Sequence, residues 1–257
     1  DHEKTLSARM SDAIISRGER IAAQIVACAL RVSGGSATVV DAADFLQTDG
    51  RFSDAAPDLA RTEIRALPLF LPIFARGEIA VVPGFIGAGK ENSVVTLGRG
   101  GSDLTATVIA RVLTANEVTL WKDVRGFLTA DPRIVPEARI VPQLDPREAS
   151  ELAYYGAKVL HPRALIPLTL GTTLRIRPFA DPDADGTEIA HGRSVAGSPV
   201  RALSAMTSQA LVTVAGNGML GVPGIAARTF GALASGGISV SLISQASSEH
   251  SICFTVP

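Results

Sequence analysis

The order of apolar and polar positions along the 257 residues predicts alternating strands and helices. Short runs rich in β-branched residues predict strands at 37–41, 78–82, 92–97, 118–124 and 173–177. Longer apolar stretches predict helices at 21–30, 59–66, 104–115 and 148–160. Strand–helix–strand alternation is typical of a doubly wound α/β sheet, in which ligands bind at the carboxyl ends of the strands.

Local composition refines some of these elements. Residues 21–30 are apolar on nearly all sides, which predicts a buried helix that ends at Gly34-Gly35. The continuous apolar start of the 118–124 strand is typical of a central parallel strand. Residues 44–60 form a polar stretch, and 125–146 are rich in proline. We expect both to be loops, and the second to be an ordered cover of a functional site.

The pattern changes after residues 191–199, which are small and polar and are the best linker candidate. A strand at 210–215, a helix at 224–233 and strands at 238–243 and 250–256 follow. This β-α-β-β order makes up the first two-thirds of a ferredoxin-like unit. We therefore expect two domains, one at 1–190 and an incomplete one at 200–257.

Composition narrows the class of protein. The chain is 46% hydrophobic with a net charge of −1, so no global field favours nucleic acid or a membrane surface. Cys28 and Cys253 lie in apolar runs, a pattern that fits buried free thiols in a reducing compartment, and the four histidines lack metal-ligand spacing. The most apolar window, 66–75, is too short to span a bilayer. We expect a soluble, cytoplasmic protein without a nucleic-acid partner, a membrane partner or a protein metal site.

The stretch with the clearest chemistry is Leu97-Gly-Arg-Gly-Gly-Ser-Asp103, at a predicted strand-to-helix turn. Glycines let the backbone approach a ligand, and Ser102 and Asp103 suit a helix N-cap. A helix N-terminus attracts anions, and Arg99 could fork onto a carboxylate or a phosphate. The alternative is an ordinary tight turn with a solvated arginine. Lys122-Asp123 ends the next strand and is expected to face the same crevice.

Two other motifs resemble ligand sites but lack residues that such sites require. Gly84–Lys90 matches the first seven positions of a phosphate-binding P-loop, but Glu91 replaces the hydroxyl residue and a strand pattern follows instead of a helix. We predict a glycine-rich surface turn there. Residues 181–186 begin like a calcium loop, yet Gly192 stands where the twelfth-position Glu is needed, so an acidic turn is expected.

Several motifs taken together resemble the aspartokinase family. They are Ser16-Arg-Gly-Glu-Arg20, Leu97-Gly-Arg-Gly-Gly-Ser-Asp103, Trp121-Lys-Asp-Val124, Leu128-Thr-Ala-Asp-Pro-Arg133, Gly156-Ala-Lys-Val-Leu-His-Pro162 and 182–187. The small C-terminal domain resembles the ACT regulatory domains that follow aspartokinase catalytic domains. The resemblance implies an amino acid kinase-like α/β/α sandwich, with a mostly parallel sheet, followed by a partial ferredoxin-like ACT domain.

The resemblance also implies an activity. Aspartokinases use ATP and Mg²⁺ to phosphorylate the β-carboxylate of L-aspartate, which gives 4-phospho-L-aspartate on the route to lysine, threonine and methionine. Carried over by position, Glu19 would bind the substrate's amino group and Arg99 its α-carboxylate. By local position alone, Glu19 and Lys158 are also ordinary charges at helix ends.

The remaining expected roles follow from the same resemblance. Ser102 and Asp103 would line the aspartate pocket, and Asp103 and Lys158 would be catalytic. The nucleotide would contact Lys122, Asp123, Leu128, Arg133, Lys158 and Val159. In the ACT domain, Asn217, Met219, Gly221 and Gln245 would bind lysine or threonine as inhibitor, and ACT domains would pair the chain into a homo-oligomer.

Some features depart from the family. Many relatives carry Thr where Lys122 stands and Tyr where Leu128 stands, and no Lys-Phe-Gly-Gly phosphate-binding motif occurs. The chain lacks an initial Met and stops within a strand-like run, so we expect part of a longer protein, inactive by itself. Its end is most similar to aspartokinases fused to homoserine dehydrogenase. The alternatives are another amino acid kinase, of the acetylglutamate or glutamate 5-kinase type, and an amino-acid-binding module that only regulates or dimerises.

Overall fold

The computed structural model describes residues 6–157, 159–192, 200–216, 222–245 and 251–257. The chain forms two compact units, Asp1–Ser204 and Ala205–Pro257. Both units combine helices with sheets, so the predicted α/β class is confirmed. Among the described residues, no helix is long and apolar enough to cross a bilayer.

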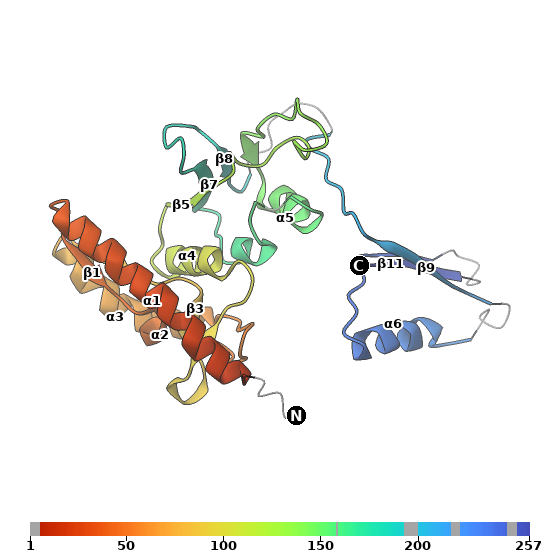
Figure 1. The fold of residues 1–257 in the computed structure, drawn as a ribbon, viewed down its shortest axis with the longest axis horizontal. Helices are drawn as coiled ribbons and strands as arrows, with labels where there is room; N and C mark the ends of the chain where they lie inside the picture. Colours follow the sequence, from red (N-terminus) through yellow and green to blue (C-terminus); the bar gives the residue numbers. More distant parts are fainter. Residues whose placement is uncertain (1–5, 158, 193–199, 217–221, 246–250) are drawn as a thin grey trace. The chain divides into compact units, whose positions relative to one another are not determined.

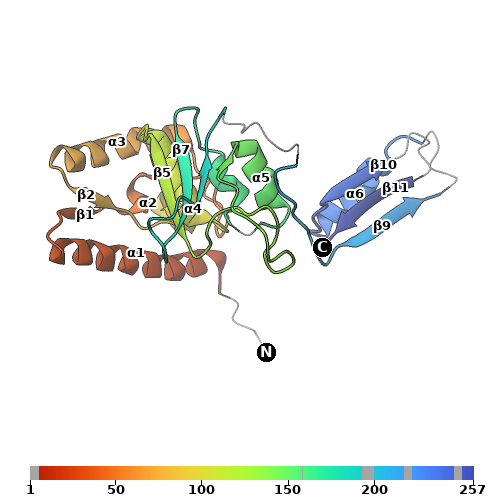
Figure 2. The same cartoon turned by 90° about the horizontal axis from the view of Figure 1, so that it is seen from above.

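The first unit carries helices on both sides of short strands (Figures 1 and 2). Its elements are α1 (Ala8–Val32), β1 (Ala37–Val39), α2 (Ala42–Phe45), α3 (Leu59–Ala75), β2 (Ile79–Val81), β3 (Ile86–Ala88), η1 (Lys90–Asn92), β4 (Val94–Thr96), α4 (Gly101–Val112), β5 (Glu117–Lys122), β6 (Gln143–Leu144), α5 (Pro146–Tyr154), η2 (Pro162–Leu165), β7 (Thr173–Pro178) and β8 (Thr187–Ile189). In Figure 2, α1 lies on one side of β1 and β2 and α3 on the other, as expected of an α/β/α sandwich.

The strand pairings are mixed. β1–β2, β5–β7 and β6–β8 are parallel, whereas β3–β4 and β7–β8 are antiparallel. The turn at 181–186 reverses the chain between β7 and β8, which makes that pair a hairpin. β5 lies at the edge of the order β5-β7-β8-β6, so its predicted central position is wrong. Its buried Val118 and Leu120 pack into a core and account for the apolar run.

Two apolar cores meet at α4. One core includes Phe45, Phe70, Leu97 and Val108, and the other is built around Phe127, Leu144, Leu174 and Ile176. α4 supplies Leu104, Val108 and Val112 to the first core and Ala110 to the second. Because both sides of α4 are packed, its N-terminus has a defined position.

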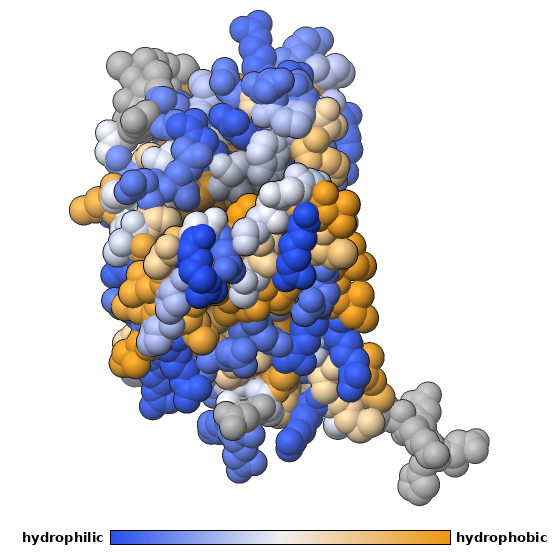
Figure 3. All heavy atoms as spheres, turned by 90° about the vertical axis from the view of Figure 1, so that its left-hand side faces the viewer, coloured by the Kyte–Doolittle hydropathy of each residue, from blue (hydrophilic) through white to orange (hydrophobic). Residues whose placement is uncertain are grey.

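The first helix differs from the prediction in length and in burial. α1 spans 25 residues from an N-cap at Ser7, and only the stripe of Asp12, Ser16, Ala23 and Ala27 is buried. Its other faces carry exposed apolar side chains: Met10, Ile14, Ile15, Ile21, Ile25, Val26 and Val32. Figure 3 shows that apolar areas also lie at the surface on one face of the molecule. A helix packed on one side buries only one stripe, so the prediction of burial all round is wrong. For the same reason Cys28 is exposed and not buried as predicted, and Cys253 is half-buried.

Two segments near the first core are more regular than predicted. α3 continues past residue 66 through Pro68 and Pro72. Each proline removes a helical hydrogen bond, but burial of Ala66, Phe70 and Ile73 along one face holds the helix together. The predicted polar loop at 44–60 includes the last two residues of α2, Asp44 and Phe45, and Phe45 is fully buried.

The glycine-rich segment 84–90 is neither a P-loop nor a surface turn. Residues Ile86–Ala88 form the buried strand β3, paired antiparallel with β4. In the chain, a short 3-10 helix and then β4 follow this segment, so no α-helix begins after Lys90 as a P-loop requires. Rejection of the P-loop is confirmed, and the surface turn is wrong.

Helix α5 ends earlier than predicted, at Tyr154, before Gly156 with its positive φ of 121°. Glycine adopts this backbone conformation without the strain that a side chain would add. Residues 155–157, 159 and 160 therefore lie beyond the helix, and Lys158 lies outside the described residues. The proline-rich loop before α5 is ordered around buried Phe127 and a bridge between Leu128 and Ile140.

The second unit contains β9 (Ala210–Ala215), α6 (Ile225–Ser235), β10 (Leu242–Gln245) and β11 (Ser251–Val256). The antiparallel order β10-β11-β9 places the last strand between the other two, as in a ferredoxin-like unit. α6 covers the face that carries Ile252 and Phe254, and Phe230 meets Phe254 edge to face. The predicted β-α-β-β order is confirmed, but the strand predicted at 238–243 begins later, at Leu242, and runs to Gln245.

Candidate active site

The turn between β4 and α4 is held from three sides. A side chain at Gly98 would place its Cβ 2.7 Å from Oδ1 of Asp54, and one at Gly101 would meet the Phe85 ring at 2.7 Å. A Cβ at Gly100 would overlap His161. Gly98 and Gly100 have φ values of 71° and 69°, a conformation that favours glycine. The glycines are therefore required for both backbone conformation and close packing.

The start of α4 differs from the predicted cap. Gly100 is the N-cap residue, and no side chain caps the helix. Ser102 and Asp103 belong to the first helical turn instead, so the capping prediction is wrong. Within the described residues, their backbone N–H groups donate no hydrogen bond. Free N–H groups at the start of a 12-residue helix favour an anion at this end.

A cavity of about 550 Å³ lies at the N-terminal end of α4. Its lining consists of Ser53, Phe85, Gly98, Arg99, Gly100, Gly101, Ser102, Asp103 and Lys122. The Arg99 side chain is exposed and forms no hydrogen bond or ion pair within the part of the chain that the structure describes. A free guanidinium beside free N–H groups provides a binding place for a carboxylate.

Lys122 and Asp103 form a close pair on the wall of this cavity. Nζ of Lys122 lies 2.7 Å from both carboxylate oxygens of Asp103, and the side chains are 23% and 13% exposed, respectively. The pair joins the carboxyl end of β5 to the first turn of α4. The crevice expected from the strand ends is therefore present, with the charge of Asp103 balanced by Lys122.

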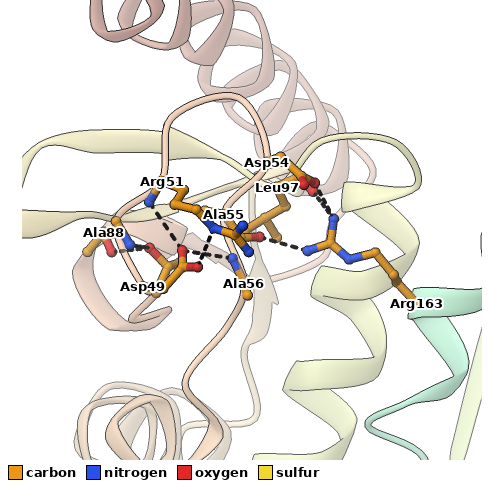
Figure 4. Close-up of polar contacts among 10 residues, drawn as sticks. Asp49, Arg51, Asp54, Ala55, Ala56, Ala88, Leu97 and Arg163 are labelled. Carbon is orange, nitrogen blue, oxygen red and sulfur yellow. Dashed lines mark hydrogen bonds and ion pairs between the residues drawn. The ribbon is translucent and has the colours of Figure 1, made fainter. Parts of the chain in front are cut away.

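A second cavity, of about 540 Å³, shares Ser53, Gly98 and Arg99 with the first. Its other lining residues are Arg51, Asp54, Ala56, His161 and Arg163. Figure 4 shows Arg163 reaching across to the 50–56 loop, where it donates to Oδ1 of Asp54 at 2.6 Å and to the carbonyl oxygens of Leu97 and Ala55 at 2.9 Å. Arg163 thus joins η2 to the loop and to the end of β4.

His161 lies where η2 meets the glycine turn. Its Nδ1 accepts a hydrogen bond from the backbone N–H of Arg163 at 3.3 Å. Burial lowers the pKa of His161, and the charges of Arg163 and Arg99 lower it further, against the opposing effects of Asp54 and Asp103. The neutral imidazole is therefore favoured near pH 7, which suits packing against Gly100.

Glu19 lies on the side of α1 that faces the strands. It continues the buried stripe of Asp12 and Ser16 at helical spacing, and it is half-buried. It lines neither of the two cavities. The structure therefore brings Arg99, Ser102 and Asp103 together at one cavity, with Glu19 apart from its lining.

Apart from Lys158, which lies outside the described residues, the expected nucleotide residues lie at the end of β5, in the loop that follows it and after α5. Lys122 reaches the first cavity, but Asp123, Leu128, Arg133 and Val159 line neither cavity. Arg133 is exposed and paired with Asp131 at 2.6 Å, and this carboxylate raises the pKa of Arg133. Val159 is half-buried against the second core.

The expected effector residues cannot be compared as a group. Asn217, Met219 and Gly221 lie outside the described residues. Gln245 is exposed at the end of β10 and pairs in register with Ile252.

Sequence reasoning missed several residues that build the site. Arg163 follows directly after a motif singled out above, and Phe85 lies within the rejected P-loop, but neither carries a local signal for its role. Ser53 and Asp54 lie in a stretch predicted only as a polar loop. Asp12, near the start of a helix that was predicted to begin later, has no sequence signal beyond its place one turn before Ser16.

Both parts of the chain match known protein families. The amino acid kinase family profile matches residues 1–178, and an ACT domain profile matches residues 212–257. The chain is 38% identical over 255 residues to the chloroplastic bifunctional aspartokinase/homoserine dehydrogenase 1 of Arabidopsis thaliana, covering 96% of this chain and 28% of that protein. It is 37% identical over 253 residues to lysine-sensitive aspartokinase 3 of Escherichia coli, covering 97% of this chain and 55% of that protein.

Solved structures give the same result. E. coli aspartokinase III in complex with aspartate and ADP matches with a TM-score of 0.85 at 34% identity, over 98% of this chain and 56% of that chain. The same enzyme in complex with lysine and aspartate matches with a TM-score of 0.80 at 33% identity, over 99% of this chain and 56% of that chain. The resemblance to aspartokinases is confirmed. The chain spans between about a quarter and somewhat more than half of the length of these relatives.

Proposed function

The chain belongs to the amino acid kinase family, and from this membership we propose that it forms the aspartate pocket and part of the nucleotide site of an aspartate kinase. The reaction is the transfer of the ATP γ-phosphoryl group to the β-carboxylate of L-aspartate, which gives 4-phospho-L-aspartate and ADP. The observation that carries the proposal is the position of Arg99 beside the N–H groups at the start of α4, in a cavity at the ends of strands, where neither has a partner within the described part of the chain.

Each substrate group has a matching partner in this proposal. Arg99 holds the α-carboxylate of aspartate in a forked contact, and Glu19 balances the α-ammonium. Ser102 and the first turn of α4 keep the substrate's remaining carboxylate oriented. Phosphoryl transfer depends mostly on alignment and charge neutralisation, so a pocket that fixes the acceptor carboxylate supplies much of what the reaction needs.

The nucleotide lies on the β5 side in this proposal. Asp123, Leu128, Arg133, Lys158 and Val159 contact it, as the resemblance implies, and Lys122 remains with Asp103 at the boundary between the two substrates. The E. coli relative solved with both aspartate and ADP supports two adjoining sites. Mg²⁺ fits here as an ion carried mainly by the ATP phosphates, since it retains waters and needs one or two carboxylates, and Asp123 offers an exposed one.

The C-terminal unit is proposed to be an ACT regulatory domain at 200–257, after a catalytic domain at 1–190. Lysine or threonine binds it as an inhibitor, through Asn217, Met219, Gly221 and Gln245, and it pairs chains into a homo-oligomer. The solved complex of the E. coli relative with lysine supports an amino-acid effector. A cytoplasmic location stays a prediction, since some of the relatives are chloroplastic.

The test is an ATP-dependent assay on the complete protein that carries this sequence, with hydroxylamine trapping the acyl phosphate. L-aspartate should give hydroxamate, whereas L-glutamate and N-acetyl-L-glutamate should not. Hydroxamate from glutamate or N-acetylglutamate alone would favour another amino acid kinase. Calorimetric binding of lysine or threonine without binding of aspartate or ATP would favour a purely regulatory module.

The same assay tests regulation. Addition of lysine and threonine in turn should show which amino acid inhibits, and light scattering should give a mass above that of one chain. Activity that is insensitive to both amino acids would contradict the proposed effector site and leave the kinase proposal standing.

A further inference from the structure

Asp12 is a buried carboxylate that the proposed reaction does not use. It lies on α1 and is 1% exposed. Among the described residues, no Lys, Arg or His forms an ion pair with it, and four hydrogen bonds satisfy it instead. A buried charge is costly unless its oxygens are fully hydrogen-bonded, so such a group normally has a definite role.

The four donors come from two segments far from Asp12 in sequence. Oδ2 accepts the backbone N–H of Ser53 at 2.8 Å and that of Thr96 at 2.9 Å. Oδ1 accepts the hydroxyl of Ser53 at 3.2 Å and that of Thr96 at 3.0 Å. One carboxylate thus joins α1 to the 50–56 loop and to the end of β4.

Both segments continue directly into the proposed aspartate pocket. Thr96 lies three residues before Arg99, and Ser53 lines both cavities. Ser53 has a φ of 66°, which non-glycine residues rarely adopt, and its carbonyl oxygen and the neighbouring Asp54 face Gly98. The hydrogen bonds from Asp12 hold this uncommon loop conformation against the glycine turn.

We infer that Asp12 is a positioning residue for substrate binding: through Ser53 and Thr96 it sets the loop and the strand end that place Arg99. This inference rests on the proposed function. It predicts a selective effect, because the Asp12 bonds end on the aspartate side of the site, whereas the nucleotide residues follow β5. Loss of Asp12 should weaken aspartate binding without weakening ATP binding.

The test is steady-state kinetics on the complete protein. Asp12→Ala should raise the KM for aspartate at least about tenfold, since small misplacements of a binding group are costly, with the KM for ATP within about twofold of wild type. In Asp12→Asn the KM for aspartate should lie within about threefold of wild type, because the amide oxygen can accept hydrogen bonds from the two N–H groups and the NH₂ group can donate to the two hydroxyls.

Thr62→Val is the matched control. Thr62 is also fully buried, and its hydroxyl accepts the N–H of Gln47 at 3.0 Å, in the segment that leads into the same loop. This variant should lower the melting temperature and leave both KM values unchanged. If Asp12→Ala does not fold, Thr96→Val, which removes one of the four bonds, should still raise the KM for aspartate about two- to fivefold.

The outcomes separate the two proposals. If Asp12→Ala folds and its KM for aspartate is normal, the positioning role is overturned and the kinase proposal stands. If Asp12→Ala does not fold, a normal KM for aspartate in Thr96→Val has the same meaning. Equal rises in the KM for aspartate and for ATP would also overturn it. A wild-type protein without aspartate-dependent turnover of ATP would overturn the proposed function, and this inference with it.

Discussion

The turn after β4 and the loop after β5 each carry an arginine that the family resemblance assigns to substrate, yet they differ in structure. In the turn, Arg99 has no hydrogen-bond or ion-pair partner among the residues that the structure describes, and its backbone is enclosed by the 50–56 loop, Phe85 and His161. In the loop, Arg133 is 76% exposed and bound to Asp131, two residues before it. The turn therefore holds a free charge at a defined place, and the loop holds a charge that is already neutralised.

The difference shows what makes a local motif into a binding site. Packing from distant segments fixes the turn before ligand binds, so little ordering is needed when an anion binds. The loop must exchange an existing ion pair for a phosphate, and exposed pairs of this kind contribute little to stability. Aspartate affinity should therefore depend on a prebuilt pocket, and nucleotide affinity on a rearrangement of the loop.

The largest expected effect is that of Arg99→Ala. Loss of a forked, charge-assisted contact should raise the KM for aspartate about 10²- to 10³-fold, measured by the hydroxamate assay. Arg65→Ala is the control, since Arg65 is exposed on α3 away from both cavities. Arg133→Ala should leave the KM for aspartate within about threefold of wild type and should raise the KM for ATP. Comparable aspartate effects in Arg99→Ala and Arg133→Ala would remove the distinction between turn and loop.

The second effect is on stability. Gly100→Ala should lower the free energy of unfolding by about 2–4 kcal/mol, because the left-handed backbone disfavours a side chain and its Cβ would overlap His161. Gly34→Ala is the matched control: Gly34 also has a positive φ, 87°, but open space around it. Gly34→Ala should lower the free energy of unfolding by about 1–2 kcal/mol, from backbone strain alone. Denaturant unfolding measures both, and equal losses would show that packing against His161 adds nothing.

A smaller effect is expected at the Lys122–Asp103 pair. Lys122→Met should cost about 1–3 kcal/mol by leaving a mostly buried carboxylate unpaired. The double variant with Asp103→Asn should recover part of this loss, and a double-mutant cycle of unfolding free energies would give the coupling. Removing the exposed Arg133–Asp131 pair should cost less than about 1 kcal/mol. A Lys122–Asp103 coupling no larger than that of the loop pair would contradict this ranking.

The smallest effect concerns pH. The pKa of His161 is lowered in the folded state, so the unfolded chain takes up a proton first as the pH falls. The contribution to stability is fully present above the unfolded pKa of about 6.5 and is lost as the pH falls through the folded pKa. Unfolding free energies between pH 5 and 8 should decline more steeply towards acid in the wild type than in His161→Gln. If the unfolding free energies of wild type and His161→Gln depend on pH in the same way, burial beside Gly100 does not lower the pKa of His161.

Local pattern was sufficient for many elements and for part of the site. The helix from 104, the strands around 80, 95, 120 and 175, and the ferredoxin-like order at the C-terminus follow from periodicity and glycine positions, which are properties of neighbouring residues. The same reasoning placed Arg99 at a helix N-terminus near a strand end. Helix ends were less predictable: packing carries α3 through Pro68 and Pro72 and leaves one side of α1 exposed.

By itself, then, the sequence determined the α/β class and the two-part organisation of its patterns, and it predicted an anion-binding turn at 98–103. Only the tertiary structure decided which groups complete the pocket. Asp12 meets Thr96 across 84 positions, Arg163 meets Asp54 across 109, and Lys122 neutralises Asp103 across 19. Such contacts leave no local signal, because each residue type is ordinary in its own segment and acquires its role only when the cores bring the segments together.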